Sequence, residues 1–155
     1  QLKSLGQSSP MIDLLGADIQ LAANEAGLAA ATLHASLTRY PNSRALRFAE
    51  GEALLAAGKP AEASRRAIEA ARLFPTDDRA FTLVARAAAA RGQRLAQHRA
   101  QAEVYALQGR LGAAVEQLQL GLRAGDGDYY EKTSAEARLA DLKQQRREQL
   151  RDARR

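Results

Sequence analysis

The sequence has no cysteine, no tryptophan and a single methionine, and aromatic residues make up only 5% of its 155 residues. The absence of cysteine excludes disulfide bonds and thiolate chemistry, and it leaves the redox compartment open. No stretch approaches the roughly 20 apolar residues that span a bilayer, and residues 1–10 lack the apolar core of a secretory signal. We therefore expect a soluble chain. Because it begins at Gln1 rather than Met, we also expect a processed form or a fragment.

Basic residues exceed acidic ones, but the excess is confined to one end of the chain. The formal net charge is +5, from 23 Lys and Arg against 18 Asp and Glu. Residues 143–155 hold six of the basic and two of the acidic side chains, which leaves 17 and 16 in the preceding residues. A nucleic-acid-binding domain normally carries a basic face along its body. The nearly neutral body therefore argues against a nucleic-acid partner.

Helix-breaking residues recur at a fixed spacing, which is the main signal in the sequence. The interval from Pro41 to Pro75 equals that from Gly58 to Gly92, and both match a helical repeat of about 34 residues. Counting back by the same interval from Gly58 reaches Asn24, and further breakers fall near the middle of each interval along nearly the whole chain. Between them, apolar residues follow the i, i+3, i+4 spacing of an amphipathic helix. The expected helices span roughly residues 10–24, 27–39, 43–57, 60–73, 77–91, 94–108, 111–124 and 128–152.

The sequence thus predicts an all-α fold of about eight helices, the last of which caps the stack. Short connections favour antiparallel neighbours, and helix pairs of this kind stack into a solenoid because one pair cannot bury its apolar face alone. We expect a flexible segment over residues 1–9, the repeat domain over residues 10–142, and the basic end of the last helix, fraying, over residues 143–155.

The stretch from Gly51 to Pro75 resembles a tetratricopeptide repeat. Gly51 and Leu54 stand at the small and large sites of its first helix, and Ala63 stands at the small crossing site of its second. The repeat ends at Pro75. By contrast, Gln97 stands where the next repeat should have its crossing alanine. The resemblance implies a right-handed superhelical solenoid of antiparallel helix pairs.

The stretch from residue 100 to residue 143 resembles the C-terminal tetratricopeptide region of periplasmic zinc metalloproteases of the beta-barrel assembly-enhancing type. The residues that carry the resemblance are Ala102, Glu103, Tyr105, Gly109, Ala114, Gln117, Leu118, Tyr129, Tyr130, Glu136, Ala137, Arg138 and Leu142. The resemblance implies a periplasmic location and a non-catalytic module that recruits protein clients or the outer-membrane barrel-assembly machinery to its own protease domain. The alternative is a free-standing tetratricopeptide adaptor or co-chaperone with no linked protease.

The protease chemistry of that family needs a helical HExxH motif, in which two imidazoles one turn apart bind zinc. Here His34 and His98 stand on different expected helices, and neither has a second His or a carboxylate one helical turn away at i+4. We expect no active site and no metal or other cofactor in this chain, with zinc belonging to a catalytic domain outside it. The Gly125–Asp128 segment lacks the later ligands of a calcium loop and is expected to be a turn that ends at the helix cap Asp128.

First helices of each tetratricopeptide pair line a concave groove, and the resemblance places several residues there. The expected protein-binding residues on first helices are Asp18, Phe48, Glu52, Arg79, Thr82 and Arg86. Arg99 and Glu103 are added from the sixth expected helix, which is a second helix by phase and could border the end of the groove. Arg79 and Arg86 are two turns apart on one face and could bind a carboxylate or backbone carbonyls. A solvated helix face remains the alternative for this set. The basic tail is expected to continue the last helix with its charges in water. It has only Leu150 as a large apolar residue to enter a membrane interface, and no aromatic residue to stack on bases.

Overall fold

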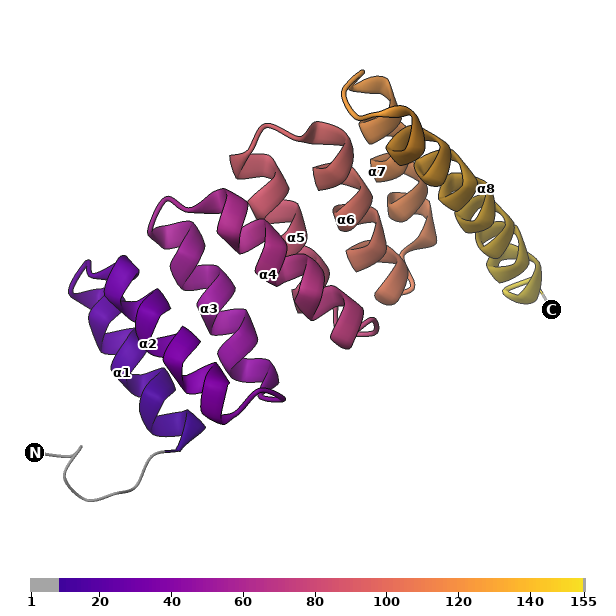
Figure 1. Ribbon diagram of the computed structural model, residues 1–155. Helices are drawn as coiled ribbons and strands as arrows, with labels where there is room; N and C mark the ends of the chain where they lie inside the picture. Colours follow the sequence, from indigo (N-terminus) through magenta and orange to yellow (C-terminus); the bar gives the residue numbers. More distant parts are fainter. Residues whose placement is uncertain (1–8, 155) are drawn as a thin grey trace, which may run out of the picture. The chain divides into compact units, whose positions relative to one another are not determined.

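The computed structural model describes residues 9–154, and every regular element in that part of the chain is a helix (Figure 1). The expected flexible segment at residues 1–9 lies outside the described residues, except for Ser9, which caps the first helix. The eight helices are α1 (Pro10–Ala22), α2 (Ala26–Arg39), α3 (Arg44–Ala56), α4 (Pro60–Leu73), α5 (Asp78–Ala90), α6 (Arg94–Leu107), α7 (Leu111–Arg123) and α8 (Tyr129–Asp152). The ends of each helix lie close to the predicted bounds. The all-α prediction is confirmed, and so is the number of helices within the described residues.

The chain divides into two compact units, one up to Ala70 and the other from Ala71. In the first unit, α1, α2 and α3 each pack against the other two. Alanine supplies most of its buried side chains, together with Leu33 and Leu46, which are fully buried. Small side chains let helix backbones approach closely, and alanine also favours the helical conformation.

In the second unit, α5 packs against α6, while α6, α7 and α8 pack against one another. Their core consists of Leu95, Ala102, Ala114, Val115, Leu118, Ala135 and Leu142. Gly121 lies where α7 crosses α6, and an added Cβ there would come within 3.0 Å of the His98 Cβ. A larger residue at this position of α7 would push its neighbours on α6 away by a few tenths of an ångström, so the close crossing favours glycine.

One turn recurs in the chain with the same backbone conformation. Asn24, Gly58, Gly92 and Gly109 have positive φ angles of 62°, 70°, 70° and 73°. In each case the next residue donates its N–H to a carbonyl of the preceding helix turn, for example Lys59 N to Leu54 O at 2.9 Å. This is the pattern of a helix C-terminus closed by a residue in the left-handed region. Asn24 adopts the conformation of the equivalent glycines, as the repeat spacing predicts.

The fourth of these turns, at Gly109, follows the third after only half a repeat, so the register of the repeat shifts by one helix at α6. Ala102 and Ala114 lie one and a half repeats after Gly51 and Ala63, and both are fully buried. In addition α6 contacts α8 across α7, as α1 contacts α3 across α2. With α7 and α8, therefore, α6 has the contacts of a first helix, while it also packs against α5. This differs from its place in an unbroken count of repeats and accounts for Gln97 at the expected crossing site.

None of the helices in the described part of the chain is long and apolar enough to cross a membrane.

Candidate functional site

Three of the predicted groove residues lie in the first unit. Asp18 is exposed on α1, and Phe48 and Glu52 are half-buried one turn apart on α3. Because residues four apart lie on the same face of a helix, Phe48 and Glu52 share one strip of α3. This strip combines an aromatic side chain with a carboxylate.

The second unit presents Arg79, Thr82 and Arg86 on one helix, α5, where Arg79 and Arg86 are exposed. Arg79 donates from Nε and Nη2 to the two carboxylate oxygens of Asp77 at 3.1 and 3.0 Å. These hydrogen bonds raise the pKa of Arg79 above its usual range. Asp77 also caps α5 through the Arg79 backbone N–H. The Arg79 guanidinium thus lies beside the helix N-terminus, held there by its own carboxylate partner.

Thr82 and Arg86 continue the strip of α5 toward its C-terminus. The Thr82 hydroxyl donates to the Asp78 carbonyl at 2.9 Å, within the same helix. Thr82 therefore adds a methyl group and a hydroxyl oxygen to the surface, while Arg86 adds a cation.

Arg99 and Glu103 on α6 contact α8. The Arg138 guanidinium donates from Nε and Nη2 to both oxygens of Glu103, each at 2.8 Å, and also pairs with Asp141. These partners raise the pKa of Arg138 above its usual range, with the Glu103 hydrogen bond as the largest cause. Arg99 donates to the Ser134 hydroxyl at 2.8 Å. In this structure, therefore, α8 occupies the part of α6 that the sequence assigned to the end of the groove.

The eight predicted residues thus form three local sets, on α1 and α3, on α5, and on α6 beneath α8. Within a unit the structure brings Arg99 and Glu103 together, one turn apart on α6. The role of all eight in binding a partner stays a prediction.

Sequence reasoning did not identify the charged cluster around Glu50, which is only 3% exposed between helices of the first unit. His34 Nδ1 lies 2.9 Å from one carboxylate oxygen of Glu50, and Arg66 Nε lies 3.4 Å from the other. Glu69 extends the cluster by pairing with Arg66 at 3.6 Å and with Arg47 at 3.0 Å. Glu50 stands one helical turn after Leu46, and this i, i+4 spacing was the available signal for its burial.

A shallow hollow of about 220 Å³ opens above this cluster. Its lining residues are Gly27, Ala30, Ala31, His34, Glu50, Leu54, Lys59, Glu62 and Arg66. The cations and carboxylates in it are matched, since Lys59 lies 3.9 Å from Glu62 and Arg66 lies beside Glu50. Ion pairs of this kind offset part of each other's desolvation cost. We infer that these ion pairs hold α2, α3 and α4 together.

Both histidines lie against side chains of neighbouring helices. His34 faces Glu50, and His98 Nδ1 lies 2.9 Å from Gln117 Oε1. Across residues 9–154 no three His, Cys, Asp or Glu side chains are grouped in a way that could hold a metal ion.

The Gly125–Asp128 turn holds two helix starts in place. Asp128 caps α8 in a capping box with Glu131, as the sequence predicts for this cap. Asp126 accepts hydrogen bonds from the backbone N–H groups of Arg94 and Leu95 at 2.6 and 3.0 Å. It thereby caps α6 from a position far along the chain, at the other end of α7, which no local pattern indicates.

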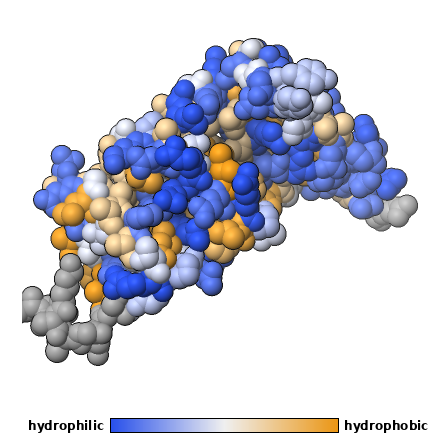
Figure 2. Space-filling model, viewed as in Figure 1, coloured by the Kyte–Doolittle hydropathy of each residue, from blue (hydrophilic) through white to orange (hydrophobic). Residues whose placement is uncertain are grey.

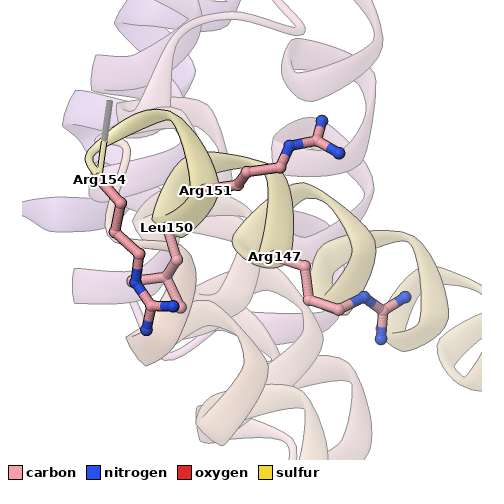
Figure 3. A pocket seen from close by; sticks show the side chains of 4 residues that line it. All are labelled: Arg147, Leu150, Arg151 and Arg154. Carbon is pink, nitrogen blue, oxygen red and sulfur yellow. The ribbon is translucent and has the colours of Figure 1, made fainter.

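The basic end of α8 surrounds a second hollow, of about 340 Å³, lined by Arg147, Leu150, Arg151 and Arg154 (Figure 3). The three guanidinium groups point in different directions in Figure 3 rather than toward a common point. A site for an anion needs donors that converge on it. The arrangement therefore gives no support to anion binding by the tail.

Comparison with known proteins adds no assignment, since no family model matches the chain and no curated protein matches it significantly.

Proposed function

We propose that the chain is a non-catalytic protein-interaction module whose helices pair antiparallel and stack in the right-handed manner of tetratricopeptide repeats, with α8 as the cap. The observation that carries this proposal is the recurrence of one left-handed turn at Asn24, Gly58 and Gly92, at the interval of about 34 residues that is typical of such repeats. Small buried residues at equivalent sites, such as Ala63 and Ala114, support it further. Stacks of this kind present extended surfaces to protein partners.

We further propose that the module is the C-terminal part of a periplasmic metalloprotease that acts in outer-membrane protein assembly and quality control. The resemblance over residues 100–143 supports this, because four of the apolar residues that carry it are core residues of the second unit, namely Ala102, Ala114, Leu118 and Leu142. The protease chemistry and any zinc would reside in a domain outside this chain. By holding a client, the module would raise the effective concentration of that client at the protease.

Client contact is assigned to α3 and α5. The Phe48 and Glu52 strip offers an aromatic surface and an acceptor, and Arg86 offers donors to backbone carbonyls or carboxylates. The exposed pair Tyr129 and Tyr130 at the start of α8 adds aromatic surface, and tyrosine is enriched where proteins bind one another.

Binding of a fluorescently labelled, unfolded outer-membrane protein, followed by anisotropy, tests this proposal. The variant Arg79→Ala with Arg86→Ala should weaken binding at least about tenfold, since even one hydrogen bond to a charged group contributes about 1.5–3 kcal/mol. Truncation after Lys143 should change binding by less than about twofold, because exposed charges are screened at physiological salt.

Circular dichroism must first show that both variants fold, since Arg79 also contacts the cap residue Asp77. If the folded truncation loses binding while the double arginine variant binds normally, α5 is the wrong site. An HExxH motif encoded upstream of Gln1 would separate the protease from a free-standing adaptor.

A further inference from the structure

The first helix is apolar on two opposite faces, and only one of them is covered. Ala17, on the inner face, is 1% exposed where α1 packs on α2 and α3. Four large apolar residues project from the opposite side and define what we call the outer face of α1, namely Met11, Ile12, Leu15 and Ile19. Their exposed fractions are 78%, 46%, 60% and 63%. By helical periodicity, these four positions form one continuous stripe.

A helix with apolar side chains on two opposite faces normally buries both of them. The next first helix in the same unit shows how the outer face is used. Leu46 and Ala53 of α3 stand one repeat after Ile12 and Ile19, and both are fully buried where α3 packs on α1 and α2. Two of the four positions on the outer face of α1 thus repeat buried packing positions of α3, but within the described residues no helix lies against this face. Figure 2 shows apolar side chains gathered at the surface over the N-terminal helices.

Gly16 supplies a second, independent observation at the edge of this face. A glycine inside a helix costs roughly 0.5–1 kcal/mol relative to alanine. The usual internal reasons are missing here, since Gly16 has a negative φ and a Cβ added to it would meet nothing within 4 Å. A glycine on the open side of a helix allows another backbone to approach closely.

The acidic residues of α1 are placed so that the outer faces of two copies can pack together. Asp13, the first acidic residue of α1, is turned inward, where it accepts hydrogen bonds from Ser36 at 2.7 Å and from Arg39 at 2.9 Å. Asp18 lies at the margin of the stripe. Two copies can therefore pair along the stripe without placing like charges opposite each other, and an apolar surface is self-complementary in a two-fold interface.

A head-to-tail contact with α8 is disfavoured, because its exposed large apolar residues, Tyr129, Tyr130 and Leu150, lie near opposite ends of the helix and form no continuous stripe. From Glu131 to Gln149 the exposed residues of α8 are polar or alanine. The outer face of α1 exposes roughly 500 Å² of apolar surface, the size of patch that marks interaction sites. Two such faces bury about 1,000 Å² in total, which suits a weak dimer.

We propose that the outer face of α1 is a self-association surface, through which two copies of the chain pair about a two-fold axis with Leu15 at the centre of the contact. This surface is separate from the client-binding residues on α3 and α5. Its test measures the mass of the assembly rather than client binding, so the two proposals can fail independently.

Sedimentation equilibrium of the 155-residue chain, from about 1 µM to about 1 mM, should show a reversible monomer–dimer equilibrium. Leu15→Glu should raise the dissociation constant at least about 30-fold, because the symmetry introduces the charge twice at a buried position. Leu150→Glu is the matched control, since Leu150 is similarly exposed, at 51%, on α8. It should leave the dissociation constant unchanged.

Gly16→Ala provides a variant that should not unfold the chain, because the structure has open space for the added methyl group. It should weaken pairing while the thermal midpoint of the monomer stays the same or rises. The proposal is overturned if the chain is monomeric throughout, or if the folded Leu15→Glu variant pairs like the parent. It is equally overturned if the chain associates only after residues 1–8 are removed, because that segment would then be the occupant of the face.

Discussion

At the scale of single residues, the unusual feature is a carboxylate that is almost completely buried. Glu50 stands on a face of α3 where Leu46 and Leu54, one turn to either side, are buried apolar residues. An unpaired charge in such a place would cost several kcal/mol, and a pair of partners offsets this only in part. Here the partners, His34 and Arg66, reach Glu50 from α2 and α4 and remain partly in water. Their role is to hold the negative charge rather than to fill the core.

This arrangement predicts a rescue. Removing both partners by His34→Ala with Arg66→Ala should lower the free energy of unfolding by about 2 kcal/mol, because the Glu50 charge is then uncompensated. Adding Glu50→Leu should restore most of the loss, since leucine fills a similar volume without a charge. Urea denaturation followed by circular dichroism measures both. A triple variant as unstable as the double one would contradict the assigned role of Glu50.

At the scale of elements, α8 consists of a half that packs and a half that does not. Ala135 and Leu142 are fully buried and stand two turns apart on the same face. Beyond Leu142 every residue of the helix except Gln145, which is half-buried, is exposed. This half is still tied to the turn before α7, since Gln149 Nε2 donates to the Gly109 carbonyl at 3.0 Å. The core boundary therefore falls at Leu142.

Two truncations should bracket that boundary. Ending the chain after Lys143 should cost no more than about 1 kcal/mol of stability, the value of one exposed hydrogen bond and some helix end effects. Ending it after Arg138 also removes the buried Leu142 and should cost about 3 kcal/mol or more. Thermal unfolding of both forms, compared with the parent, measures the difference. Equal losses would show that the distal half of α8 contributes as much as its core residue.

The boundaries of these elements were largely predictable from the sequence, because the breakers act locally. Glycine or asparagine in the left-handed region, and proline in a first turn, end and start helices without help from distant residues. The register shift at α6 was not predictable in this way. Gln97 signalled a mismatch, but only the close crossing at Gly121 and the contact of α6 with α8 reveal that α6 packs on the helices that follow it as well as on α5.

The groove residues were predicted less completely for a related reason. Positions on a helix face follow from spacing, and Arg79, Thr82 and Arg86 share one helix as expected. Which side chains pair with one another depends on distant contacts. Neither the Arg138 pair with Glu103 nor the capping of α6 by Asp126 leaves a signal in the spacing of the residues concerned.

At the scale of the molecule, the second unit contains a core of its own. The buried residues that form it all come from α6, α7 and α8, and α5 adds a further row of buried alanines. Asp77 caps α5, so a chain that starts at Pro75 keeps the cap of its first helix. Domains of about 80 residues bury enough surface to fold alone, with small margins.

We therefore predict that a fragment of residues 75–155 folds by itself. It should show helical circular dichroism and a cooperative thermal transition, since the crossing at Gly121, the capping of α6 by Asp126 and the Arg138 pair with Glu103 all lie within it. Leu118→Ala in the same fragment removes a fully buried side chain. It should lower the midpoint by about 10 °C or more, because such a cavity costs about 2–5 kcal/mol. A fragment that is unfolded, or that melts gradually and is insensitive to Leu118→Ala, would mean that the core of this unit is not self-sufficient.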